Sequence, residues 1–87
     1  MSYVEMNEAK RKEVWFLDSG CNNHMCGDEV LFCDFNDSFK QMVKLGNNLR
    51  MSVMGKGNVR LQVNGFVHII TKVYYIPDLK NNLLSIG

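Results

Sequence analysis

A run of large apolar residues, Trp15 to Leu17, ends directly in Asp18, Ser19 and Gly20. A charged carboxylate at the end of a buried strand costs several kcal/mol unless another group pairs with it or a reaction uses it. Two carboxylates held close together share one proton, so such a pair can activate a water molecule while it protonates a carbonyl. The triplet therefore makes Asp18 a candidate catalytic carboxylate, with Ser19 anchoring the loop and Gly20 allowing close backbone approach.

The sequence Asp-Ser-Gly occurs once in the chain. A pair of carboxylates would therefore need a second copy of the chain, which predicts a two-fold symmetric homodimer with Asp18 on its axis.

A second constellation lies just after the triplet and suits a different chemistry. Four side chains within a short span could ligate a tetrahedral zinc ion: Cys21, His24, Cys26 and Cys33. The separation of His24 from Cys26 is tighter than that of most zinc ligands, and no second ligand pair lies at zinc-finger distance. The alternative interpretation is that the cysteines are small buried thiols and that the histidine is hydrogen-bonded within a loop.

Composition limits the remaining possibilities. The chain has 87 residues, 46% hydrophobic and 22% charged, with a net charge of +1. These values indicate one small globular domain without a surface for direct nucleic-acid binding. No apolar run is long enough to span a bilayer, so no membrane association is expected. An odd number of cysteines without a secretory segment favours free thiols and a cytoplasmic location.

The pattern of apolar residues predicts the elements that would position these groups. Residues 1–13 are polar and are expected to be a flexible leader or linker, with the folded domain over 14–87. A short strand is expected at 14–17 and a short helical or strand piece near 30–35. A hairpin is expected around residues 46–48 and another around Asn64-Gly65, with Pro77 ending the last strand. The chain is therefore expected to be all-β, with almost no helix.

The segment between the two hairpins contains Gly55, Lys56 and Gly57 after Met54. Glycines on both sides of one residue permit unusual backbone angles, which favours a mobile tip that could close over a ligand, although an ordinary turn would have the same composition.

Three ordered segments resemble the protease region of copia-type LTR retrotransposon polyproteins. They are "WFLDSGCNNHMCGDEVLF", "VKLGNNLRMSVMGKGNVRLQVNG" and "VYYIPDLKNNLLSIG". The resemblance covers residues 14–87 and implies a retropepsin-like half-barrel with a flap hairpin. It also implies a homodimeric aspartic endopeptidase that needs no cofactor, cleaves its own Gag-Pol polyprotein and resides in an intracellular retrotransposon particle.

The resemblance also assigns roles to residues. It makes Asp18, Ser19 and Gly20 catalytic and places Leu83, Leu84 and Ser85 behind their loop. The residues expected to contact the polypeptide substrate are Asn22, Asn23 and His24 after the loop, and Met54, Gly55, Lys56 and Gly57 as the flap. Asn22 replaces the Ser usual in copia-type sequences. Related proteases continue with a helix and an interface strand where this sequence ends, so the domain is expected to lack its C-terminal end. The alternative to an active protease is therefore an inactive retropepsin-like fragment that acts as a protein-binding domain.

Overall fold

The structure is a computed structural model that describes residues 2–8, 11–19, 22–44 and 48–86, with side chains from Trp15 onward. The described residues form β1 (Ser2–Glu8), β2 (Arg11–Asp18), β3 (His24–Cys26), the 3-10 helix η1 (Glu29–Leu31), β4 (Phe32–Asn36), β5 (Gln41–Lys44), β6 (Arg50–Val53), β7 (Gly55–Val63), β8 (Phe66–Tyr75) and β9 (Asn82–Ser85). The expected all-β fold class is confirmed. No helix in these ranges is long and apolar enough to cross a membrane.

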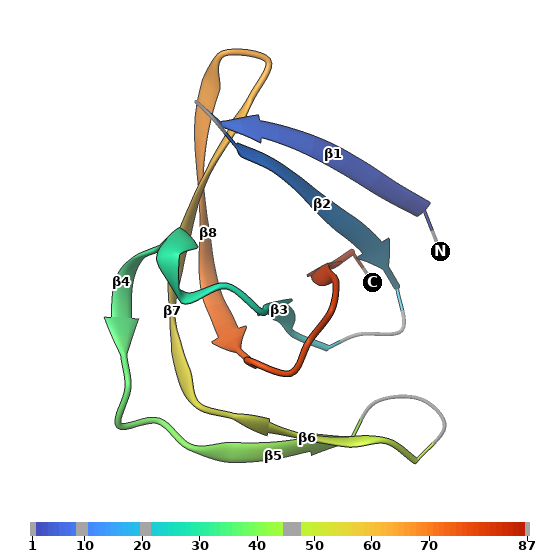
Figure 1. Cartoon of the computed structure of the whole chain (residues 1–87), viewed down its shortest axis with the longest axis vertical. Helices are drawn as coiled ribbons and strands as arrows, with labels where there is room; N and C mark the ends of the chain where they lie inside the picture. Colours follow the sequence, from blue (N-terminus) through green and yellow to red (C-terminus); the bar gives the residue numbers. More distant parts are fainter. Residues whose placement is uncertain (1, 9–10, 20–21, 45–47, 87) are drawn as a thin grey trace.

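Seven strands form one sheet in the order β1-β2-β9-β3-β8-β7-β4, and β5 and β6 form a separate two-stranded sheet. The large sheet curls, so that β1 contacts β7 although five positions separate them in the strand order. Figure 1 shows the β5–β6 hairpin running beneath this curled sheet. The hairpin is therefore joined to the main sheet at only one end.

The N-terminal residues differ from the sequence-based expectation. Ser2–Glu8 pairs antiparallel with β2 along its whole length, from Ser2 opposite Leu17 to Glu8 opposite Arg11. Residues 2–8 and 11–13 are therefore strand where a flexible leader was expected. A polar strand at a sheet edge is stabilised by backbone hydrogen bonds, which a search for apolar runs does not detect.

Both predicted hairpins are present. The turn between β7 and β8 has two residues, Asn64 with φ 52° and Gly65 with φ 82°, and Val63 is paired with Phe66. Two positive φ angles define the type I′ turn that matches the twist of the flanking strands. In the β5–β6 hairpin, Gly46 and Asn47 of the predicted loop lie outside the described residues. Strand β8 ends at Tyr75, two residues before Pro77, as predicted.

Two groups of buried side chains hold the sheets together, and β3 separates them. The first includes Trp15 and Cys26, both fully buried, and is completed by residues of η1, β7 and β8. The second centres on Met25, Val53 and Ile76. Because successive side chains of a strand point to opposite faces, Met25 and Cys26 place one residue of β3 in each group.

Candidate active site

Asp18 is the last residue of β2, and its neighbour across the sheet is the last residue of β9. These two strands are parallel, with Asp18 in register with Ser85 and Leu17 with Leu84. The Ile86 backbone N–H donates to the Asp18 carbonyl oxygen at 3.4 Å. Asp18 is half-buried and Ser19 is exposed. The sheet therefore holds the carboxylate-bearing residue at a strand end where the chain leaves the core and turns outward.

His24 belongs to the strand on the other side of β9 and contacts the same position. Its Nδ1 accepts the Ser85 backbone N–H at 3.0 Å. Because Nδ1 accepts, the proton of the neutral ring is on Nε2. Desolvation by burial lowers the pKa of His24 below its ordinary value, which favours this neutral form. His24 thus fixes the end of β9 beside Asp18, a contact that the expectation of a substrate-facing histidine did not include.

The remaining residues expected around the Asp-Ser-Gly loop are only partly placed. Asn22 is exposed and Asn23 is half-buried, both just before β3. Gly20 and Cys21 lie outside the described residues. The arrangement leaves the Asn22 side chain accessible to a ligand approaching the strand ends.

The segment predicted to be a flap, Met54 to Gly57, has a different position. Gly55 and Gly57 lie inside β7, opposite Tyr75 and Val73 of β8. Gly57 is also paired with Phe35 of β4, so this part of β7 has a neighbour on each side. The segment is therefore part of a strand and not the tip of a turn, whereas its contact with a substrate stays a prediction. The two glycines are required because β4 packs tightly against β7.

The β5–β6 hairpin, which precedes this segment, is separate from the main sheet. It forms its own two-stranded sheet, with Gln41 paired to Val53 at the base and Lys44 to Arg50 toward the tip. Val53 is 1% exposed and packs with Met25, so the base is anchored near β3. The base of the hairpin is therefore fixed in the second core group.

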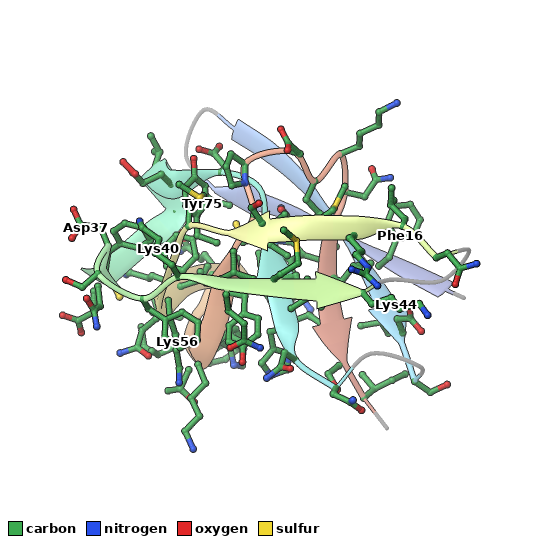
Figure 2. The ribbon with its side chains drawn as sticks, turned by 90° about the horizontal axis from the view of Figure 1, so that it is seen from below. Phe16, Asp37, Lys40, Lys44, Lys56 and Tyr75 are labelled. Carbon is green, nitrogen blue, oxygen red and sulfur yellow. The ribbon has the colours of Figure 1, made fainter. Side chains whose placement is uncertain are left out.

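Lys40 ties the two chain segments at the base of this hairpin. Its Nζ donates to the backbone carbonyls of Asp37 at 2.5 Å and of Met54 at 2.8 Å. Lys40 and Asp37 lie together at one end of the hairpin and Lys44 at the other (Figure 2). Since Asp37 precedes β5 and Met54 follows β6, one ammonium group bridges both entry points of the hairpin. The sequence offered no cue to this role.

The structure gives the zinc interpretation no support among the residues it describes. Cys26 is fully buried in the core, whereas Cys33 is exposed on β4 and its thiol donates to the Asn58 carbonyl at 3.5 Å. Within the described ranges, no three His, Cys, Asp or Glu side chains form a group that could hold a metal ion. Cys21 lies outside these ranges.

One further contact of β9 was not expected from the sequence. Asn82 Oδ1, at the start of β9, accepts the Gly27 backbone N–H at 2.9 Å. A side chain at Gly27 would collide with the Leu79 carbonyl, so the backbone approaches too closely there for any other residue. Together with His24, this contact fixes β9 to β3 near both of its ends. Side-chain contacts between segments far apart in sequence leave no periodic pattern, so only the tertiary structure shows them.

Comparison with known proteins identifies the family to which this arrangement belongs. A family model for the Pol polyprotein, beta-barrel domain, matches residues 15–87, which include every strand from the end of β2 to β9. The chain belongs to this family. No solved structure matches it.

Two relatives of this Pol beta-barrel domain are transposon proteins. A putative transposon Ty5-1 protein of Saccharomyces cerevisiae is 35% identical over 78 residues, which cover 90% of this chain and 51% of the yeast protein. The retrovirus-related Pol polyprotein from transposon TNT 1-94 of Nicotiana tabacum is 29% identical over 72 residues, covering 82% of this chain and 5% of the polyprotein. The Pol beta-barrel domain thus spans about half of one relative and a small part of the other.

Proposed function

We propose that this Pol beta-barrel domain is one subunit of a retropepsin-like aspartic endopeptidase that processes a copia-type retrotransposon Gag-Pol polyprotein. The observation that carries the proposal is the position of Asp18, half-buried at the end of β2 and in register with Ser85 of β9. The names of the two relatives support a transposon polyprotein as the source of this domain.

The chemistry requires two copies of the chain. Two Asp18 carboxylates brought together on a two-fold axis would share one proton, because close like charges cannot both ionise. The ionised carboxylate takes a proton from a bound water, whose oxygen attacks the peptide carbonyl carbon, while the protonated carboxylate gives its proton to the carbonyl oxygen. Breakdown of the resulting diol transfers a proton to the leaving nitrogen and breaks the C–N bond. No covalent enzyme intermediate forms.

Within each subunit, the other residues have supporting roles in this proposal. His24 and Asn82 hold β9 against β3, and β9 in turn supports the end of β2 that carries Asp18. The β5–β6 hairpin takes the place of the flap and would cover a bound polypeptide. Asn22 and Asn23 would contact substrate beside the carboxylates.

The test is cleavage of denatured casein and of an unbiased peptide library, measured against total chain concentration. Specific activity should rise with concentration, because the dimer is the active species. Asp18→Asn should remove cleavage while the thermal unfolding curve is retained, and Asp78→Asn, at an exposed turn, should change neither.

Cleavage that persists in Asp18→Asn would contradict the proposal. If no concentration gives Asp18-dependent cleavage, the domain is a non-catalytic binding module, and the proposal is also wrong.

A further inference from the structure

The outer end of the β5–β6 hairpin places two cations directly opposite each other. Lys44 and Arg50 are paired residues of the antiparallel ladder and both are exposed. Like charges at directly opposite positions destabilise a sheet. Neither side chain has a hydrogen bond or an ion pair with any residue that the structure describes. The hairpin thus carries a repulsive pair that an anion would relieve.

No carboxylate close in sequence to Lys44 and Arg50 could relieve their repulsion. Residues 38–77 contain no Asp or Glu, and their cations are Lys40, Lys44, Arg50, Lys56, Arg60 and Lys72. Several of these already have partners: Lys40 binds two carbonyls, and the Lys56 Nζ lies 5.1 Å from the centre of the Phe39 ring. Lys44 and Arg50 are therefore the cations of the hairpin that remain available to a ligand.

The two cations share a pocket with apolar side chains. Met42 and Val43 line it together with Lys44 and Arg50, and its volume is about 270 Å³. Met42 is 58% exposed, so the apolar surface is open to solvent beside the charges. A pocket of this composition suits an acidic side chain flanked by apolar residues.

The form of the hairpin favours a polypeptide over a nucleic acid. Among the residues that the structure describes, β5 and β6 pair only with each other, so each has an outer edge to which an extended peptide can add by backbone hydrogen bonds. Single-stranded nucleic acids are usually bound through base stacking on aromatic side chains, and residues 41–53 contain no aromatic residue.

We infer that the cross-strand pair Lys44 and Arg50 on the β5–β6 hairpin, with Met42 and Val43, forms a binding site for an acidic residue within an extended apolar peptide segment. In its role as a substrate site, this inference rests on the proposed function. The proposed function has the hairpin cover any bound polypeptide. The inference adds that the hairpin prefers polypeptides with Asp or Glu near the cleaved bond.

The test is a titration that does not depend on cleavage. The full chain carrying Asp18→Asn, labelled with ¹⁵N, is titrated with a capped nonapeptide of serines with Leu-Glu-Leu at its centre, and with the same peptide carrying Gln in place of Glu. The Glu peptide should bind about fivefold more tightly, the effect of two exposed charge pairs, and should shift the amide resonances of Lys44 and Arg50. This difference should decrease in 0.5 M salt.

Variants of the pair sharpen the measurement. Lys44→Gln with Arg50→Gln should abolish the difference between the two peptides, and Lys44→Glu with Arg50→Glu should reverse it toward a peptide with Lys at the centre. The matched control, Lys72→Gln, removes an exposed charge from β8 and should leave the fivefold ratio unchanged.

Equal binding of the Glu and Gln peptides would overturn the inference, and so would tighter binding of a short oligouridylate at the same residues. Because catalysis does not enter the titration, failure of Asp18-dependent cleavage would leave the anion site standing as a binding site. A chain that cleaves polypeptides but binds both peptides equally would instead remove the site and keep the proposed function.

Discussion

Burial favours the neutral form of His24, and this neutral form accepts a hydrogen bond that supports the fold. Burial lowers the pKa of the imidazole, and Nδ1 accepts the Ser85 N–H only while it carries no proton. In the unfolded chain the same histidine titrates near its ordinary value of 6.5. Between the two values the unfolded state therefore binds more protons than the folded state, so the free energy of unfolding rises with pH in that range.

The predicted consequence is a loss of stability on acidification that depends on His24. The free energy of unfolding should fall as the pH decreases through 6.5 toward the lower folded-state pKa, because the unfolded chain takes up a proton there while folded His24 stays neutral to accept from Ser85. His24→Gln should lose about 1 kcal/mol at pH 7.5 with the hydrogen bond and show a flatter profile between pH 7.5 and 5.5. Urea unfolding at several pH values measures both effects.

His68 provides the matched control, because it is exposed on β8. His68→Gln should leave the pH profile as steep as in the unmodified chain. An unchanged profile in His24→Gln would show that the Nδ1 contact does not govern the acid behaviour.

At the scale of elements, close packing against β4 explains the glycines of β7. The hydrogen bonds of Lys40 connect the two chain segments at the base of the β5–β6 hairpin. A Cβ at Gly57 would overlap the Asp34 carbonyl, and one at Gly55 would overlap the Phe35 ring. Both partners belong to β4, so the glycines set how closely β4 approaches β7. The β5–β6 hairpin lies before them in the chain, between the two carbonyls that Lys40 bridges.

Gly57→Ala should therefore act on stability. Overpacking against a backbone carbonyl costs about 1–3 kcal/mol, because β4 must shift to make room. Gly65→Ala is the comparison: a Cβ there meets nothing within 4 Å, so only its φ of 82° is strained and the cost should be about 1 kcal/mol. Chemical denaturation of both variants gives the ranking, and a smaller loss for Gly57→Ala than for Gly65→Ala would contradict the packing argument.

Lys40→Met should loosen the hairpin without unfolding the domain. The substitution keeps most of the side-chain volume and removes the hydrogen bonds to the Asp37 and Met54 carbonyls, so amide hydrogen exchange in β5 and β6 should accelerate about tenfold while that of β7 and β8 is unchanged. Lys44→Met is the control in the same hairpin, since Lys44 has no such bond within the part of the chain that the structure describes. Equal acceleration in both variants would rule out the bridge.

At the scale of the whole molecule, β3 couples two cores that could otherwise unfold separately. Cys26 belongs to the group containing Trp15, and Met25 belongs to the group containing Ile76 and the base of the hairpin. Since the two side chains are adjacent on one strand, neither core can be lost without disturbing the other. The domain should therefore unfold in a single transition.

Ile76→Val tests this coupling, because Trp15 is the one tryptophan and lies in the other core. The variant should lower the free energy of unfolding by about 0.5–1.5 kcal/mol, the usual cost of removing one buried methyl group. The midpoint in urea should shift equally when followed by Trp15 fluorescence and by far-UV circular dichroism. An unshifted fluorescence midpoint would mean that the two cores unfold independently.

The sequence alone determined the features that depend on local pattern. Alternating apolar residues predicted β7, β8 and the Asn64-Gly65 turn, because a half-buried strand and a type I′ turn each restrict the residues that can form them. An apolar run stopped by turn residues predicted the end of β2 at Leu17, one residue before its end at Asp18.

Only the tertiary structure decided which segments lie against each other. Long-range pairing puts Ser85 beside Asp18, His24 beside Ser85, and Gly57 beneath β4. The sequence does not distinguish a glycine that permits mobility from a glycine that permits close packing, so residues 55–57 were expected at a tip although they lie in β7 beside β4. The polar strand β1 was missed for a related reason, since its partner supplies the hydrogen bonds that order it.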